Sequence, residues 1–535
     1  MSTQSDQVVV IGAGPVGLAT AIELGSRGVP CLVLERLERA GHAPRAKTTH
    51  TRTREHLRRW GIADKLAAAS PFGVDYPSDV VFVTSMAGVE IARFHDALNC
   101  SPQRDERYSE HSQWIPQYTL EAVLFEHASS IPGVEIRYGS EFVSFEQDED
   151  QVVATVRRND TGAEEEIYGA YLVGADGSQS RVREQIGATM VGTHGLSHNL
   201  NMVVRAPGMA EAHGHGQAIM YWQLNPEAPS LFGPMDDDDR WFFMPTGVPE
   251  GTSYTDEESV DLIRRSTGID LEYELLSCDY WVASRLLADS YRKGRAFLAG
   301  DACHLHPPFG GFGMNMGVAD GVDIGWKLAA VLQGWGGPTL LDSYEAERRG
   351  AHEYVMDEAE ANHALKPSEL FRPGMDADDQ TGASIRIELR ELILDKKRAE
   401  FHALGVVLGY CYQGSPVIVD DGTVGDWTRQ REYFPSATPG CIAPHRWLDD
   451  DRSLYDLFGT GFTLLVLRGD HADDIEAARR EADTSGAPLD IVHPGDDTLA
   501  DLYEAELALV RPDQIVAWRG NVWPHTDPFT TVTGR

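Results

Sequence analysis

The chain has 535 residues, 42% of them hydrophobic and 24% charged, which is typical of a folded protein with two or three domains. Its 83 acidic residues exceed its 46 basic ones and give a formal net charge of −37. A surface of this sign repels nucleic-acid phosphates and anionic lipids, so we expect neither nucleic acid nor a membrane among its partners.

Signals for membrane insertion or export are absent from the sequence. No run approaches eighteen apolar residues, and the N-terminal "MSTQSDQ" lacks the basic and apolar regions of a signal peptide. The six cysteines are scattered without a CxxC pair or a metal-like spacing. We therefore expect a cytoplasmic protein with reduced thiols and no metal site.

The first predicted elements are a buried strand, a glycine-rich turn and a helix. Residues 8–11 form a continuous apolar run, and residues 12–17, "GAGPVG", match the GxGxxG pattern directly after it. Apolar residues at helical spacing follow, and residues 31–34 form the next predicted strand, which ends at Glu35. This order predicts a dinucleotide-binding site without distinguishing FAD from NAD.

Each residue type in this turn has a physical reason. Gly12 makes the turn, Gly14 lets a pyrophosphate approach the backbone, and Gly17 packs the helix on the strand. Pro15 lies in the same turn, at the helix N-terminus that would face the phosphates. Glu35 is placed to accept a hydrogen bond from a ribose hydroxyl.

Two further motifs follow in chain order. Residues 171–184, "YLVGADGSQSRVRE", are built on Asp176 and Arg181. Residues 300–317, "GDACHLHPPFGGFGMNMG", lie between an apolar run and a helix-like stretch. With the GxGxxG turn, these motifs resemble those of the class A flavoprotein monooxygenases, the family typified by 4-hydroxybenzoate hydroxylase. The resemblance implies FAD as the cofactor.

The C-terminal part extends the resemblance. The segments "PGCIAPHRWL", "SLYDLFGTGFTLLVL" and "LALVRPDQIVAWRG" are similar to the C-terminal thioredoxin-like domain of the phenol hydroxylase and polyketide hydroxylase branches. Because this region has no CxxC pair, we expect it to serve packing or a homodimer rather than redox chemistry.

The resemblance assigns roles to polar residues toward FAD. Asp301 would hold the ribityl chain, and Glu35, with Arg36 beside it, the adenosine ribose. Arg45 and Gln117 match positions that contact the FAD phosphate or the isoalloxazine region. Asp176 of the middle motif belongs to the same cofactor-binding set, and Arg181 would lie near the pyrophosphate, where NAD(P)H would also dock.

The glycine-rich loop would carry the flavin ring, because a side chain there would collide with it. The first amides of the following helix would aim at the flavin N1 and C2 carbonyl, where reduced flavin is negative. The residues assigned here are Pro308, Gly311, Gly313, Met314 and Asn315. The alternative is a plain tight turn, which the presence of the other two motifs disfavours.

The family reaction needs a group that helps to ionise a phenol. NADPH or NADH reduces FAD, reduced flavin and O2 form a C4a-hydroperoxide, and this transfers oxygen to an electron-rich ring. Lys47 and His50 are the favoured candidates for the base, with His304 and His306 as alternatives. The resemblance also places Pro308 beside the substrate, where its backbone carbonyl would meet the hydroxyl.

Two alternating segments, "GQAIMYWQLNPEAPSLFGPM" and "RWFFMPTG", predict strands of a sheet that covers the flavin. Tyr221 is a candidate hydrogen-bonding partner for the substrate, although alternation allows only one of Tyr221 and Trp222 to face it. The remaining candidates for an aromatic pocket are Met220, Trp222, Phe232, Phe243 and Met244. Alternatively, all of these residues are sheet core.

We therefore predict an α/β fold with a Rossmann-like FAD-binding domain, a β-sheet substrate domain and a C-terminal thioredoxin-like domain. The FAD-binding domain would comprise residues 1–75, 100–185 and 285–365, and the sheet domain residues 76–99 and 186–284. Residues 366–409 would form a linker and a helix with apolar spacing over 383–404, and residues 410–535 the last domain.

The favoured function is an NAD(P)H-consuming monooxygenase that hydroxylates a phenolic or polycyclic aromatic substrate. Two alternatives use the same scaffold: a Baeyer–Villiger-type or other flavin oxidoreductase, and a flavoprotein that sequesters a ligand without catalysis. A halogenase is disfavoured, because its WxWxIP pattern is only faintly echoed.

Overall fold

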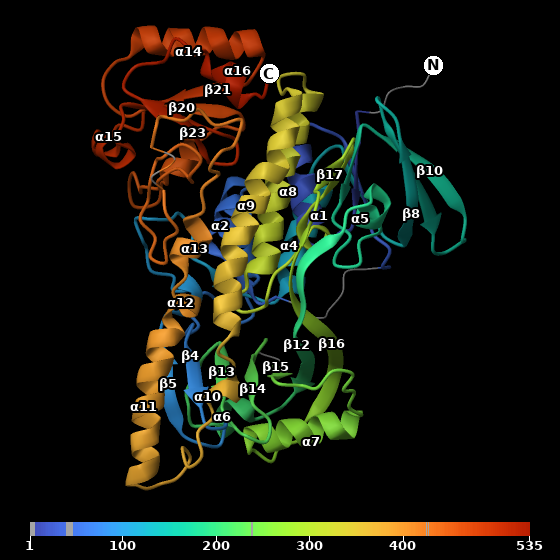
Figure 1. The fold of residues 1–535 in the computed structure, drawn as a ribbon, viewed down its shortest axis with the longest axis vertical. Helices are drawn as coiled ribbons and strands as arrows, with labels where there is room; N and C mark the ends of the chain where they lie inside the picture. The colour runs from blue at the N-terminus through green and yellow to red at the C-terminus, as the bar shows by residue number, and fades with distance from the viewer. Residues whose placement is uncertain (1–5, 39–45, 237–238, 424, 426) are drawn as a thin grey trace.

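A computed structural model of the chain describes residues 6–38, 46–236, 239–423, 425 and 427–535 (Figure 1). Its centre is a six-stranded sheet of order β17-β18-β11-β1-β2-β7, parallel except for the edge strand β17. These strands are β1 (Val8–Ile11), β2 (Cys31–Leu34), β7 (Val134–Arg137), β11 (Tyr171–Gly174), β17 (Arg292–Lys293) and β18 (Ala296–Leu298). The predicted strand–turn–helix–strand unit is confirmed.

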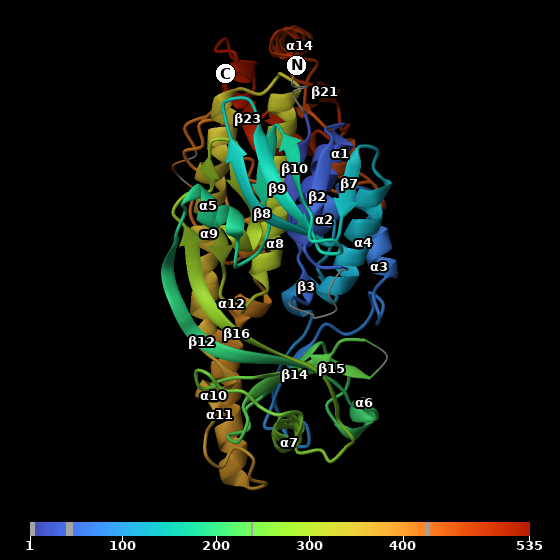
Figure 2. The ribbon, with the colours of Figure 1, turned by 90° about the vertical axis from the view of Figure 1, so that its right-hand side faces the viewer.

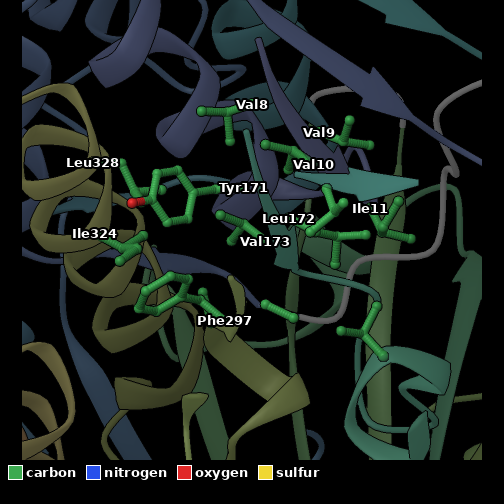
Figure 3. Close-up of a cluster of buried hydrophobic side chains, with 14 of the residues drawn as sticks. Val8, Val9, Val10, Ile11, Tyr171, Leu172, Val173, Phe297, Ile324 and Leu328 are labelled. Carbon is green, nitrogen blue, oxygen red and sulfur yellow. The ribbon is translucent and has the colours of Figure 1, made fainter. Parts of the chain in front are cut away.

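The central strands are apolar throughout because both faces of the sheet are covered. Figure 3 shows β1 and β11 side chains packed against Ile324 and Leu328 of α8. The helices around this sheet are α1 (Pro15–Ser26), α2 (Thr51–Arg59), α3 (Ala63–Ala68), α4 (Gln117–Ser130), α5 (Arg181–Ile186), α8 (Phe312–Leu332) and α9 (Pro338–His363). A three-stranded sheet lies beside it: β8 (Ser140–Gln147), β9 (Val152–Arg158) and β10 (Glu164–Gly169).

Glycines let α1 and α8 pack closely. A Cβ on Gly321 would lie 2.8 Å from the carbonyl oxygen of Val16, and a Cβ on Gly325 would lie 2.7 Å from Cβ of Glu23. The helix that follows the second glycine-rich loop is therefore held directly against the helix that follows the first. This contact brings the two N-termini toward one region.

A second sheet has eight strands in the order β19-β16-β12-β15-β14-β13-β4-β5. Its two longest strands, β12 and β16, curve from the central body into the lower sheet (Figure 2). The strands are β4 (Val80–Val83), β5 (Glu90–Phe94), β12 (Met190–Arg205), β13 (Met220–Gln223), β14 (Ser230–Pro234), β15 (Arg240–Pro245), β16 (Glu274–Ala288) and β19 (His304–Leu305). Because β19 belongs to the glycine-rich loop, that loop is part of this sheet.

The two faces of this sheet carry different clusters. The near face packs against Phe309 of the glycine-rich loop and includes Phe82, Trp222 and Phe242. The far face lies under α7 (Asp256–Thr267) and includes Tyr221, Phe232, Trp241 and Phe243. Short elements complete this region: α6 (Met209–Ala212), the 3-10 turns η1 (Ala97–Asn99) and η2 (Gly300–Ala302), and the two-stranded pair β3 (Thr48–Thr49) and β6 (Gln113–Trp114).

The helix expected over 383–404 is interrupted. The chain forms α10 (Pro367–Leu370), α11 (Gln380–Lys396), α12 (Arg398–Phe401) and α13 (Leu404–Leu408). At the break, the buried ammonium of Lys397 donates to Glu400 at 2.7 Å and to the Asn362 carbonyl at 3.0 Å. These tertiary contacts, which apolar spacing does not reveal, turn the chain at Lys397.

The C-terminal part contains a four-stranded sheet of order β21-β20-β22-β23 and lies beside α8 and α9 at the upper end of Figure 1. Arg511 joins it to those helices, donating to Glu347 at 2.6 Å and to Asp323 at 3.3 Å. Lys327 donates to the same two carboxylates. The elements are β20 (Phe462–Val466), β21 (Leu489–Val492), β22 (Leu507–Val510), β23 (Val516–Gly520), η4 (Leu454–Leu457), α14 (Ala472–Ser485), α15 (Thr498–Tyr503) and α16 (Pro528–Val532).

Over the described residues, none of the helices combines the length and the hydropathy needed to cross a membrane.

Candidate functional site

The first glycine-rich turn contains two kinds of glycine. Gly12 has φ +103° and Gly17 would place a Cβ 1.9 Å from the Gly12 carbonyl oxygen, so the fold itself requires both. Gly14 differs, since a Cβ built on it meets no atom within 4 Å and its φ is −73°. Gly14 caps α1, and Pro15 is the first helical residue. The open space at this helix N-terminus therefore fits a pyrophosphate rather than a packing need.

Glu35 lies across this turn. Its carboxylate accepts hydrogen bonds from the Ala13 and Leu37 amides, both at 2.9 Å. The acid predicted to accept from a ribose is thus held at the end of β2, beside the open helix N-terminus. The neighbouring Arg36 is exposed, and Arg45 lies outside the described residues.

The second glycine-rich loop, like the first, ends at a glycine that caps a helix. The Gly311 amide donates to the Pro308 carbonyl at 3.2 Å, and Gly311, with φ +70°, caps α8. A Cβ on Gly313 would approach only Cβ of His306, at 3.9 Å. The first amides of α8, up to that of Met314, have no preceding helical turn to donate to. These donors suit an electron-rich edge such as that of a flavin pyrimidine ring.

The Asn315 side chain is occupied within the protein. Its Oδ1 accepts from the His50 amide and from Thr53 Oγ1, each at 2.8 Å. Its Nδ2 donates to the carbonyls of Thr48 at 2.9 Å and Gly311 at 2.8 Å. The side chain therefore ties the two loops together, whereas the expectation for Asn315 concerns its backbone amide at the start of α8 and stays a prediction.

His50 holds the same loop. Its Nε2 donates to the Gly310 carbonyl at 2.9 Å, so this nitrogen carries a proton. Burial lowers the pKa of His50 to about 4, which keeps the ring neutral. These contacts do not suit a base, and the expectation for His50 is corrected to a role in holding the loop.

Lys47 has a different environment. Its Nζ lies 4.3 Å from the ring centroid of Phe242 on the near face, and burial lowers the pKa of Lys47 to about 8. The Phe242 ring lies 6.2 Å from that of Trp114, which lines a cavity with Tyr76 and Gln113. Lys47 thus combines an aromatic surface with an amine that can lose its proton near neutral pH.

Tyr221 faces away from this region. Its hydroxyl donates to the Gly216 carbonyl, and its ring packs among the far-face residues under α7. The prediction that Tyr221 contacts the substrate is therefore wrong, because the alternation of β13 points Trp222 to the near face instead. Phe232 and Phe243 share the far face, whereas Met220 and Met244 pack on the near face.

We expect Tyr221→Phe to leave kcat and KM within about twofold and to cost about 1 kcal/mol of stability through the lost hydrogen bond. Trp222→Phe, one residue further but on the near face, should change KM more. Steady-state kinetics and urea unfolding of both variants check this. A tenfold loss of kcat in Tyr221→Phe would contradict the assignment of faces.

The middle motif serves the fold as well as the site. Asp176 accepts from Ser180 Oγ at 2.5 Å and from the Val182 amide at 3.2 Å, at the start of α5. Arg181 donates to the Phe142 carbonyl and pairs with Glu141, both at 2.8 Å. Arg181 therefore lies against β8, and the expectation that it faces the pyrophosphate stays a prediction.

Arg183 and Gln117 also reach the loops. Arg183, which sequence reasoning missed although it lies in the same motif, donates to the Ala302 carbonyl in the glycine-rich loop at 3.0 Å. Gln117 accepts from the Ala46 amide at 3.1 Å and so holds the segment before Lys47. Asp301 is exposed at the start of the loop.

The alternative bases His304 and His306 point behind the loop. His304 Nε2 lies 2.9 Å from Asp320, and His306 Nε2 lies 3.3 Å from Nδ1 of His352. Both interactions are with helices α8 and α9 rather than with the near face.

Comparison with known families agrees with these features. The sequence model of the FAD binding domain family matches residues 5–359, and that of the aromatic-ring hydroxylase C-terminal family matches residues 436–535. Tetracenomycin B2 monooxygenase-dioxygenase of Streptomyces olivaceus is 33% identical over 562 residues, which cover 98% of this chain and 97% of that protein.

Solved structures give the same result. The chain is similar to the rebeccamycin biosynthetic enzyme RebC with reduced flavin, with a TM-score of 0.90, 33% identity and 99% of each chain covered. It is also similar to aklavinone-11 hydroxylase in a ternary complex with FAD and aklavinone, with a TM-score of 0.83, 31% identity and 100% of each chain covered.

Proposed function

The chain belongs to the FAD-dependent aromatic-ring hydroxylases, and we propose that it uses NAD(P)H and O2 to hydroxylate a phenolic, polycyclic aromatic substrate at the near face. The observation that carries this proposal is the pair of open helix N-termini, at Gly14 and Gly313, beside an aromatic surface that holds Lys47.

The protein's part is to bind and orient. The α1 N-terminus receives the pyrophosphate and Glu35 the ribose, while Asp301 binds the ribityl chain. The α8 amides from Phe312 to Met314 receive the pyrimidine edge. Bound FAD supplies the oxygen activation that side chains lack.

Lys47 carries the acid–base step in this proposal. With its pKa near 8, a neutral amine can accept the phenol proton, and the resulting ammonium stabilises the phenolate. The Pro308 carbonyl is the second group that we assign to the substrate hydroxyl. The apolar near face keeps water from the ring.

The proposed substrate class and cellular location rest on different observations. Two of the compared proteins are named for tetracenomycin B2 and aklavinone, and these names are the support for proposing a polycyclic phenol. The six cysteines are free thiols, which favours the cytoplasm. We also propose that NADPH or NADH binds transiently and that the C-terminal part supports a homodimer.

The test is direct. The purified protein should show a flavin spectrum, and a polycyclic phenol should stimulate NADPH or NADH oxidation and gain sixteen mass units. Oxidation without a hydroxylated product would favour a different flavin oxidoreductase. Failure to bind flavin at all would overturn the proposal.

Replacing Asp301 with alanine should raise the Kd for FAD about 10- to 100-fold, because one charge-assisted hydrogen bond to the ribityl chain is lost. Fluorescence titration of the apoprotein measures it. Asp378→Ala, an exposed aspartate before α11, is the control and should bind FAD normally. Full affinity in Asp301→Ala would remove this residue from the site.

A further inference from the structure

Behind the glycine-rich loop lies a fully buried carboxylate, Asp320 on α8. Its Oδ2 accepts from the Gly300 amide and from His304 Nε2, both at 2.9 Å. Its Oδ1 accepts from His352 Nε2 at 3.0 Å and from Arg348 Nε at 2.7 Å. One carboxylate thus receives hydrogen bonds from two points of the loop and two residues of α9.

These contacts determine where the histidine protons are. A carboxylate only accepts, so His304 and His352 each carry their proton on Nε2. The bare Nδ1 of His352 then accepts from His306 Nε2 at 3.3 Å, which fixes the tautomer of His306 as well. Burial lowers the pKa of His352 to about 3 and that of His306 well below its usual range, so both rings are neutral.

The loop is held from both sides. Asp320 contacts the loop at Gly300 and at His304 and, through His352, is linked to His306. His50 and Asn315 hold the opposite end at Gly310 and Gly311. The residues between these anchors are Pro307, Pro308 and Phe309, and Phe309 packs on the near face of the sheet.

We propose that Asp320 is a positioning residue for the flavin-binding loop, acting through the fixed tautomers of His304, His352 and His306. This inference rests on the proposed function, since the loop matters only if it carries the flavin. Arg348 keeps the carboxylate ionised and so maintains the whole chain of hydrogen bonds.

The same histidines are close enough to hold a metal ion, but the charges oppose it. Asp320 and Arg348 already balance each other beside the neutral rings of His306 and His352. A divalent cation would leave two uncompensated positive charges in a fully buried site, which is costly. The cluster is therefore better suited to hydrogen bonding.

The first test compares Asp320→Asn with Asp323→Asn. Asp323 lies one turn further on α8, is equally buried and pairs with Lys327 and Arg511 instead of the loop. Both variants should lose thermal stability. Only Asp320→Asn should raise the Kd for FAD at least tenfold, shift the midpoint potential of bound FAD and increase NAD(P)H oxidation without product. Equal FAD binding in the two variants would overturn the proposal.

A second pair of variants, both at His306, remains informative if Asp320→Asn fails to fold. His306→Gln keeps an amide N–H for Nδ1 of His352, whereas His306→Leu removes it. We expect near-normal FAD affinity and coupling in the first variant and at least a fivefold loss of affinity in the second. Identical behaviour of the two would contradict the proposal.

Nitrogen NMR of labelled histidine tests the tautomers without depending on activity. His352 should be neutral and protonated at Nε2, and His304 should carry a proton on Nε2, in apoprotein and holoprotein. A proton on Nδ1 in place of Nε2, or one bound zinc ion per purified chain, would overturn the proposed chain of hydrogen bonds. If the wild-type protein bound no FAD, the proposed function would fail. The NMR spectra of the apoprotein would still show which nitrogen of each histidine carries the proton.

Discussion

Gly14→Val is expected to weaken FAD binding at least about 100-fold while the protein still folds. A Cβ at this position meets no protein atom within 4 Å, and the backbone angles, φ −73° and ψ −178°, are open to valine. The added methyl groups would occupy the space in which the pyrophosphate contacts the α1 amides. Loss of two such charge-assisted hydrogen bonds raises Kd at least about 100-fold.

Fluorescence titration and thermal unfolding of the apoprotein separate binding from folding. Gly350→Val is the matched control, because a Cβ there also meets no atom within 4 Å but lies on α9, exposed and distant from the turn. Gly17→Ala should instead disrupt the fold, since its Cβ would lie 1.9 Å from a backbone oxygen. Normal FAD binding by folded Gly14→Val would refute the assignment of this turn.

Lys47→Met is expected to reduce hydroxylation about 100-fold or more with FAD still bound, the usual cost of losing a general base. Wild-type activity should rise with pH through about 8, as the Lys47 ammonium loses its proton. The activity of the variant should not rise with pH near 8. It should rise only at higher pH, where the substrate itself ionises. Lys65→Met, at an exposed lysine of α3, should leave the pH profile unchanged.

The same substitution should stabilise the fold at neutral pH. The pKa of Lys47 falls from 10.5 to about 8 on folding, so the unfolded chain binds more protons between these values. Wild-type stability therefore rises with pH over this window, and the charged form costs up to roughly 3 kcal/mol at pH 7. In urea unfolding, the advantage of Lys47→Met should be largest at pH 7 and shrink toward pH 10.5. A pH-independent difference would contradict the assigned pKa.

Local backbone requirements made much of this protein predictable. Gly12, Gly14 and Gly17 can be assigned from sequence because each role depends on a short chain segment: a turn, an approach of phosphate and a helix contact. The loop with Asp301 and the helix that starts at Phe312 are predictable for the same reason. The order of these segments identified the fold and the cofactor.

The orientation of side chains depended on contacts between distant segments. Alternation left open which of Tyr221 and Trp222 lies on the near face, and the packing of α7 on the opposite face decided for Trp222. His50 has a suitable intrinsic pKa for a base, but its Nε2 donates a hydrogen bond to the carbonyl of Gly310, 260 residues away, and this contact fixes the ring proton on Nε2.

The sequence by itself determined the strand–turn–helix unit, the glycine-rich loop and the family, since these depend on residue types at short spacing. Only the tertiary structure decided that Lys47, and not His50, faces the aromatic near face. It alone brought Asp320, His352 and His306 together from two helices and a loop. Burial and partners set proton positions, and both are properties of the packed molecule rather than of any segment.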